Sequence, residues 1–148
     1  MKNLVLIIAV VLLGSMSSCE ETKKVIGVAG SVQLSGNYMV TDITGAPDKI
    51  SKEGDPLTIN FAALDRSIRG NTGCNTYFGT YTIDLYALSF SDIGATERAC
   101  SEPVMAKESA FMMALGNTGS YELQNNILTL FSKTDRSVLL TAKKEVQE

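Results

Sequence analysis

Apolar and polar residues alternate in short stretches along much of the chain. Leu57, Ile59 and Phe61 alternate with polar neighbours, and such alternation places the apolar side chains on one face of a strand. Other stretches are rich in β-branched and aromatic residues, which favour strands. The predicted strands cover residues 57–61, 79–83, 88–91, 121–123, 127–131 and 138–141. From residue 35 onwards, the chain is therefore expected to be mostly β-structure.

Two polar segments separate the last of these strands. Asn125 and Asn126 lie between two apolar segments, and Asn tolerates the positive φ that a two-residue hairpin turn needs. Residues 133–136, Lys-Thr-Asp-Arg, form a second polar turn. These turns predict an antiparallel arrangement of the C-terminal strands.

One segment interrupts the strands with a helical pattern. Ser101 is a favourable helix N-cap, and the Glu-Pro pair after it suits the first turn. Val104, Phe111 and Leu115 then fall on one face, and Gly116 is a candidate C-terminal stop. A helix of roughly twelve residues inserted among antiparallel strands predicts an α+β fold, with the strands packed on a single α-helix.

The N-terminus has the pattern of a secretory signal peptide. Lys2 precedes ten consecutive apolar residues, Leu4 to Leu13, and small residues lead to Cys19. A membrane-spanning helix needs about 20 apolar residues, so an uncleaved span reaching Met16 is the weaker alternative. The segment resembles the lipobox of bacterial lipoproteins, with Met16 where an aliphatic residue is usual. The resemblance implies that residues 1–18 are removed and that Cys19 is acylated.

The mature chain divides into a tether and one domain. Residues 19–33 contain charged residues, glycines and serine, and are expected to form a flexible tether between lipid and domain. The alternative is that Val25 and Ile26 add a short edge strand. Residues 34–143 are expected to form the folded domain.

The net charge of the chain limits the classes of partner that it is expected to bind. The whole chain has a formal net charge of −3, and loss of Lys2 with the signal peptide makes it one unit more negative. Nucleic acids are bound by basic surfaces, so no nucleic-acid partner is expected. A polybasic membrane patch is equally disfavoured. The expected membrane attachment is the lipid on Cys19.

The chain contains no histidine. This excludes a Ser-His-Asp triad, a Cys-His pair and an imidazole metal site. Residues 70–73 resemble a phosphate-binding loop only superficially, because no Lys-Ser or Lys-Thr follows. The acidic residues at 92, 97, 102 and 108 show no spacing that singles out a catalytic pair. We therefore predict a protein that is not an enzyme and has no cofactor or metal.

Cys74 and Cys100 are the two remaining cysteines. In an exported protein such a pair favours a disulfide. Two free buried thiols are the alternative, and a zinc site would need more ligands than two thiolates supply.

Several motifs together resemble the META domain family of HslJ-like heat-shock proteins of bacterial envelopes. The central motif is Arg-Gly-Asn-Thr-Gly-Cys-Asn at residues 69–75, followed by Tyr-Phe-Gly-Thr-Tyr at 77–81. The match continues through residues 88–90, 96–100 and 108–111, then Leu115 and residues 128–130, and it spans Leu34 to Thr141. Tyr38 stands where the family usually has tryptophan. The resemblance implies antiparallel strands curled around one helix, an envelope location, an association with stress and no catalytic residue.

These observations predict a non-enzymatic envelope lipoprotein with a binding or envelope-integrity role. The alternative is a periplasmic inhibitor-type module that acts on a protease or a lysozyme-like enzyme. Arg69, Asn75 and Tyr77 are the candidate contacts to an unknown protein or envelope component. The competing interpretation is that this loop is only a constrained turn held by Cys74. Glu20 follows Cys19 where one inner-membrane retention signal has Asp, which favours the outer membrane.

Overall fold

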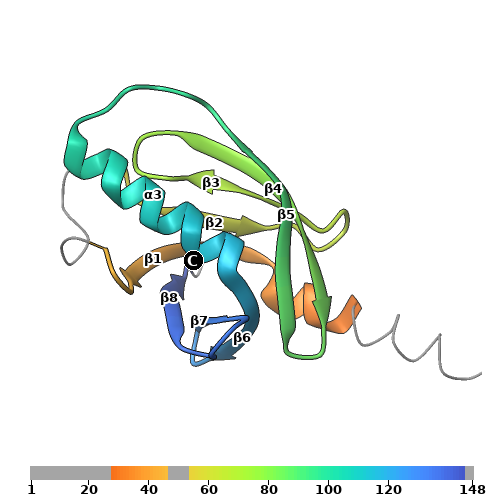
Figure 1. Ribbon diagram of the computed structural model, residues 1–148. Coiled ribbons are helices and arrows are strands. Elements are labelled where there is room, and N and C mark those ends of the chain that lie inside the picture. Colours follow the sequence, from red (N-terminus) through yellow and green to blue (C-terminus); the bar gives the residue numbers. More distant parts are fainter. Residues whose placement is uncertain (1–27, 47–53, 146–148) are drawn as a thin grey trace, which may run out of the picture.

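Eight antiparallel strands form a closed β-barrel in the computed structural model (Figure 1). The structure describes residues 28–46 and 54–145, so the predicted signal peptide, Cys19 and most of the predicted tether lie outside the described residues. The elements are β1 (Gly36–Ile43), β2 (Thr58–Phe61), β3 (Ser67–Asn71), β4 (Thr76–Asp84), β5 (Ala87–Ala95), α3 (Glu102–Asn117), β6 (Thr118–Gln124), β7 (Ile127–Ser132) and β8 (Val138–Lys144). A short helical segment, residues 28–34, precedes β1.

Pairing of the first strand with the last closes the barrel. In β1 and β8, Tyr38 lies opposite Lys144 and Ile43 lies opposite Leu140. The predicted α+β fold class is therefore wrong, because the molecule is mainly β and its sheet closes on itself. Local alternation identifies strands, whereas closure depends on pairing between residues nearly a hundred positions apart, which periodicity does not encode.

The weakest seam of the barrel lies between β5 and β6. Their register contains one residue pair, Ala87 with Ser120, and the Tyr121 N–H donates to the Tyr86 carbonyl at 3.0 Å. The chain between these strands forms α3, which packs against β5, β8, β1 and β7. Figure 1 shows α3 lying across the barrel and leading directly into β6.

The helix α3 is longer than the sequence predicts. Ser101 is its N-cap residue, and the Ser101 carbonyl accepts from the amides of Val104 and Met105 at 3.0 Å. Gly116 does not end the helix. Thr118 does so instead, because its extended backbone starts β6 while its hydroxyl donates to the Ala114 carbonyl at 2.8 Å.

Aromatic rings fill the barrel interior. Phe61 lies edge-to-face against Tyr38 and Tyr81, with ring centroids 5.6 and 5.3 Å apart. Tyr77 packs in the same way on Phe111 of α3, at 5.4 Å. Residues of β4 alternate strictly between buried and exposed, as a strand with one face in the core requires.

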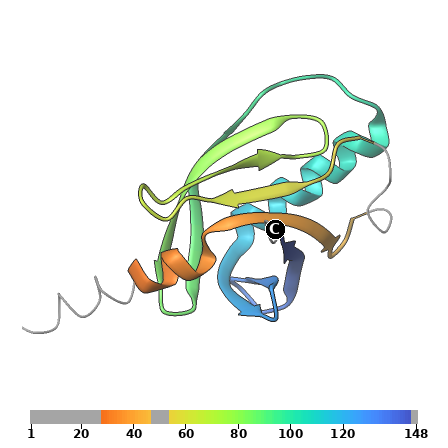
Figure 2. The same cartoon turned by 180° about the vertical axis from the view of Figure 1, so that it is seen from behind.

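The helical segment 28–34 lies against one end of the barrel (Figure 2). It buries Ser31 and Leu34, and a Cβ added to Gly30 would lie 2.9 Å from Ile83. This helix occupies the last residues of the predicted tether. Within the described residues, no helix is long and apolar enough to cross a membrane.

The predicted hairpin turn at Asn125 and Asn126 is confirmed. Gln124 pairs with Ile127, and the two Asn residues have φ values of 51° and 64°. The Asn-Asn pair therefore supplies the backbone that a two-residue hairpin turn demands.

Candidate functional site

Residues 70–75 of the family motif, here called the signature loop, run from the end of β3 to the start of β4 as a tightly bonded turn. The Thr72 N–H donates to the Asn75 carbonyl at 2.7 Å. Gly73 has a φ of +93°, and its N–H donates to Asn71 Oδ1 at 2.6 Å. Gly70 has a different role, because a Cβ there would lie 2.0 Å from the Thr58 carbonyl oxygen. Both glycines are thus required by local geometry.

Asn75 connects the signature loop to two other parts of the chain. Its side-chain oxygen accepts from the Thr96 hydroxyl at 2.9 Å and from the Arg98 N–H at 2.8 Å. Its amide nitrogen donates to both carboxylate oxygens of Glu108 in α3, at 3.1 and 3.0 Å. The Thr72 hydroxyl donates to the same carboxylate at 2.8 Å. These bonds fix the loop, the segment before α3 and the helix to one another.

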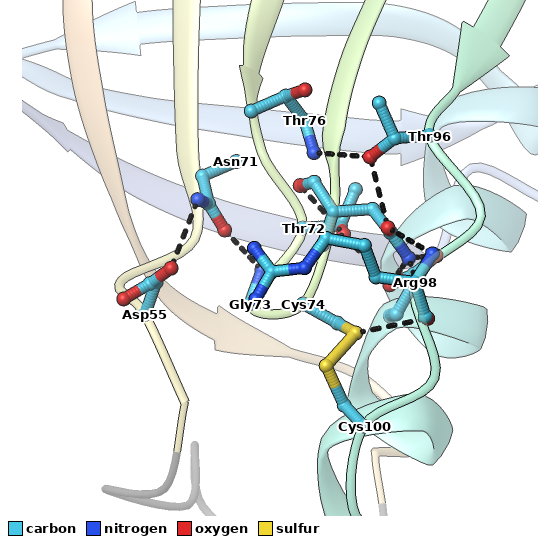
Figure 3. Close-up of a disulfide and its surroundings, with 11 residues drawn as sticks. Asp55, Asn71, Thr72, Gly73, Cys74, Thr76, Thr96, Arg98 and Cys100 are labelled. Carbon is cyan, nitrogen blue, oxygen red and sulfur yellow. Dashed lines mark hydrogen bonds between the residues drawn. A yellow bond between two sulfur atoms is a disulfide. The ribbon is translucent and has the colours of Figure 1, made fainter.

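A disulfide between Cys74 and Cys100 strengthens the same junction (Figure 3). This is the disulfide that the sequence analysis favours for the two cysteines. Their Cα atoms are 6.0 Å apart, and 26 positions separate them in sequence. The bridge joins the signature loop to the residue just before the N-cap of α3, so the cysteines serve the architecture of the loop.

Two of the three predicted partner contacts lie inside the fold. Tyr77 is 2 % exposed and Asn75 is 5 % exposed. The Tyr77 hydroxyl donates to the Thr58 carbonyl at 3.1 Å, and burial raises the pKa of Tyr77. Arg69 of β3 is exposed. In this conformation neither Asn75 nor Tyr77 presents a side chain to a partner, and the contacts agree with the competing interpretation of a constrained turn.

A concave surface lies elsewhere, beside the weak seam between β5 and β6. A groove of about 480 Å³ is lined by Tyr86, Ser120, Tyr121, Glu122, Phe131 and Arg136. Its residues come from the β4–β5 turn, from β6, from β7 and from the loop before β8. Ligand pockets have volumes of roughly 300 to 1,000 Å³ and combine apolar walls with a few polar groups. The groove fits this description.

Backbone geometry positions the polar and aromatic groups of the groove. Arg136 has a φ of 59°, and its N–H donates to the Ser132 carbonyl at 3.1 Å. Tyr86 is 75 % exposed, whereas Tyr121 is buried. Burial is the largest cause that raises the pKa of Tyr121. The groove therefore offers an exposed ring, a guanidinium and the carboxylate of Glu122.

Two smaller hollows share Tyr86 with the groove. One, of about 240 Å³, also contains Lys133. The other, of about 250 Å³, extends to the N-terminal helix through Gly30 and Gln33. Sequence reasoning missed this site, because its residues come from four separate segments. The available signal was Tyr86, an aromatic residue in a turn between two alternating strands.

No group of three or more acidic or cysteine side chains that could hold a metal occurs in the part of the chain that the structure describes. Glu108 of α3 and Glu122 of β6 have different roles. Glu108 accepts from Thr72 and Asn75, and Glu122 lines the groove.

The META domain family model matches residues 31–145. The chain belongs to the META domain family. This match confirms the family resemblance and covers the whole barrel. A META domain indicates an envelope-associated protein family, and the family is not known for enzymatic activity. No curated protein matches the chain.

Solved structures share the fold of this META domain. A protein from Burkholderia xenovorans, determined by NMR, is 23 % identical with a TM-score of 0.64, and the alignment covers 82 % of this chain and 90 % of that chain. A second NMR structure is 22 % identical, with a TM-score of 0.59 and coverages of 77 % and 93 %. A DUF4847 family protein from Bacteroides vulgatus is 19 % identical, with a TM-score of 0.54 and coverages of 77 % and 95 %. At these identities the likeness concerns the fold alone.

Proposed function

We propose that this META domain protein is a non-enzymatic lipoprotein of the bacterial cell envelope, anchored in the outer membrane by lipid on Cys19. We further propose that it acts in envelope stress by binding a ligand in the groove beside Tyr86. The groove is the single observation that carries the binding proposal. The apolar run that ends before Cys19 supports the anchor. The inhibitor-type alternative stays a prediction.

The groove favours a small amphipathic ligand with an anionic group. The rings of Tyr86 and Phe131 offer an apolar surface, and the Arg136 guanidinium can pair with an anion in two parallel hydrogen bonds. Glu122 at the same groove disfavours a ligand that is negative at both ends. A short-chain phospholipid has the required chemistry, because it combines an anionic headgroup with apolar chains.

Binding in the groove is tested with a monomeric short-chain phosphatidylglycerol and the purified chain. NMR spectra should show concentration-dependent changes at Tyr86, Phe131 and Arg136. Arg136→Asn should weaken binding by at least about tenfold, because a charge-assisted hydrogen bond is lost. Asn tolerates the positive φ at this position, so the loop should keep its fold.

Arg69→Asn is the matched control, because Arg69 is an exposed arginine on β3 outside the groove. Affinity should be unchanged in this variant. If Arg69→Asn weakens binding and Arg136→Asn does not, the groove is not the site and the sequence-based contact at Arg69 is favoured. If the probe changes no signal at the groove, this ligand class is wrong.

The anchor is tested separately. Mass spectrometry of the mature chain should show Cys19 at its N-terminus with attached acyl chains. Cys19→Ser should release the chain from membranes or leave it unprocessed. A cleaved Cys19→Ser chain that remains in the membrane fraction would contradict the anchor.

A further inference from the structure

Exposed apolar side chains gather at one end of the barrel. Leu64, at the tip of the β2–β3 turn, is fully exposed, and Leu85 and Tyr86 are exposed at the tip of the β4–β5 turn. Val28 and Val32 are exposed on the helical segment between them. Scattered surface leucines are ordinary, but exposed apolar residues from three segments at one end indicate an interaction surface.

The β4–β5 turn has residue types that its geometry does not favour. Asp84 pairs with Ala87, so Leu85 and Tyr86 are the two central residues of the hairpin turn. Leu85 has a φ of 55°, a conformation that favours Gly or Asn and is strained for leucine. The β6–β7 turn of the same protein uses Asn-Asn in this role. The fold itself thus gives no reason for a leucine and a tyrosine at this tip.

The N-terminal helix presents two valines to the outside in the same region. Val28 and Val32 are four residues apart, so they lie on one helix face. Ser31 and Leu34 are buried on the barrel side. Together with the two turn tips, this helix face forms what we call the apolar end: Val28, Val32, Leu64, Leu85 and Tyr86.

Specific contacts hold the three segments of the apolar end together. The Tyr81 hydroxyl donates to the Ala62 carbonyl in the β2–β3 turn at 3.3 Å and is also hydrogen-bonded to Ser31 of the helix. The hollow that contains Gly30 and Gln33 is also lined by Leu85 and Tyr86. Figures 1 and 2 show the helix between the two hairpin tips. The fold therefore fixes the relative positions of these segments.

We propose that the apolar end rests in the headgroup region of the lipid bilayer that carries the chain. This inference rests on the proposed lipid on Cys19. Nine positions separate Cys19 from Val28, and an extended chain spans at most about 3.6 Å per residue. The helix therefore lies within roughly 30 Å of the anchor. Tyrosine is common at the membrane–water interface, because its ring is apolar and its hydroxyl is polar.

The charges at this end are mixed. Asp65 and Asp84 lie next to the exposed tips in the sequence, and Arg66 adds a cation. Arg136 lines the groove with Tyr86, and Lys144 Nζ donates to the Gln33 carbonyl of the N-terminal helix. The Asp65 carboxylate accepts from the Ser67 amide and hydroxyl at 3.1 and 2.8 Å. Because carboxylates and cations are both present around the tips, we expect apolar burial to drive the contact. The contact should then depend little on anionic lipid or on salt.

The chain has no tryptophan, so one introduced tryptophan reports on one position. The full lipidated chain carrying Leu64→Trp or Val32→Trp is placed in phosphatidylcholine vesicles, and a second set contains phosphatidylglycerol. The matched control is Met105→Trp, because Met105 is exposed in the first turns of α3. Figure 1 shows the start of α3 on the opposite side of the molecule from the N-terminal helix. Emission of the first two variants should shift to shorter wavelength, and brominated lipid should quench it in both vesicle types. The control should remain solvent-like.

Three outcomes would overturn the proposal. The first is that Leu64→Trp and Val32→Trp behave like Met105→Trp in vesicles. The second is a blue shift in detergent-free solution without vesicles, together with a dimer in sedimentation, which would make a second copy the occupant. The third is quenching only in phosphatidylglycerol vesicles and only at low salt. Mass spectrometry shows directly whether Cys19 carries acyl chains. A failure of the proposed anchor can therefore be distinguished from a failure of the proposed bilayer contact.

Discussion

At the scale of single residues, Tyr38 departs from the rule that buried polar groups are paired. Its side chain is fully buried, and its hydroxyl has no hydrogen-bond partner among the described residues. The ring contacts Phe61, and the Lys144 ammonium lies 5.6 Å from the ring centroid. The ring of Tyr38 is therefore well packed, while its hydroxyl lacks a hydrogen bond among the described residues.

Tyr38→Phe should therefore leave the free energy of unfolding unchanged or raise it by about 1 kcal/mol, because an unpaired buried hydroxyl is removed. Tyr77→Phe is the matched control and should lower it by about 1 kcal/mol, because the hydrogen bond to the Thr58 carbonyl is lost. Urea unfolding measures both values. A larger loss for Tyr38→Phe than for Tyr77→Phe would show that the Tyr38 hydroxyl has a stabilising partner.

Alkaline pH should destabilise the protein through its buried tyrosines. Burial raises the pKa of Tyr38 from 10.0 to about 12. Between these two values the unfolded chain binds fewer protons than the folded chain, so the free energy of unfolding falls as pH rises. Denaturant unfolding across this range should show that loss, and Tyr38→Phe should reduce it. A slope that is the same in the variant would contradict the assignment to Tyr38.

At the scale of elements, the signature loop illustrates how a sequence motif can be structural. The side chain of Asn75 satisfies the Arg98 amide and the Glu108 carboxylate at once. These bonds bring together β4, the segment before α3 and α3 itself. The motif could be recognised in the sequence. Its structural role could not be predicted, because the side-chain partners of Asn75 lie more than 20 positions away.

Asn75→Ala should lower the free energy of unfolding by about 2 to 3 kcal/mol, because it leaves the Arg98 amide and one side of the Glu108 carboxylate without a partner. Thr76→Ala is the matched control at the next position. Its side chain is exposed, and surface substitutions usually change stability by less than about 0.5 kcal/mol. Equal urea midpoints for the two variants would refute the bridging role of Asn75.

The two hairpin turns show which elements can be predicted. Asn125 and Asn126 were recognisable because their residue type matches the positive φ of the turn. Leu85 also has a positive φ, of 55°, but leucine is not a residue type that predicts one. The groove beside Tyr86 was missed for the same reason, since local pattern gives no signal for it.

At the scale of the whole molecule, most strands and the helix could be predicted, but the closed barrel could not. Alternation at 57–61 identified β2, and Ser101 identified the start of α3. Closure depends on β1 meeting β8, which is a long-range pairing. The same pairing keeps all eight strands in one sheet, although α3 separates β5 from β6 in the sequence and those two strands share only one residue pair.

The disulfide should stabilise the whole domain by restricting its unfolded chain. A bridge between residues 26 positions apart contributes about 3 to 4 kcal/mol in the chain-entropy model. Reduction should lower the free energy of unfolding by about 2 to 4 kcal/mol, measured by urea unfolding with and without reductant. Cys74 and Cys100 should resist alkylation before reduction and react afterwards. Rapid alkylation of both thiols in unreduced native protein would contradict the bridge.

The pairing of β1 with β8 has a practical consequence for labelling. The Glu145 N–H donates to the Asn37 carbonyl at 2.8 Å, and Lys144 Nζ donates to the Gln33 carbonyl at 3.3 Å. Residue 145 therefore leaves the barrel next to the N-terminal helix. A fluorescent protein or an affinity tag that continues the chain from residue 145 would start beside the N-terminal helix and the first residues of β1. An insertion at the Asn125–Asn126 turn would start close by as well, because the Lys144 N–H donates to the Asn126 carbonyl. The exposed side of α3 at Met105 is the better place for a reporter, because the loop at residues 133–136 contains Arg136 of the groove.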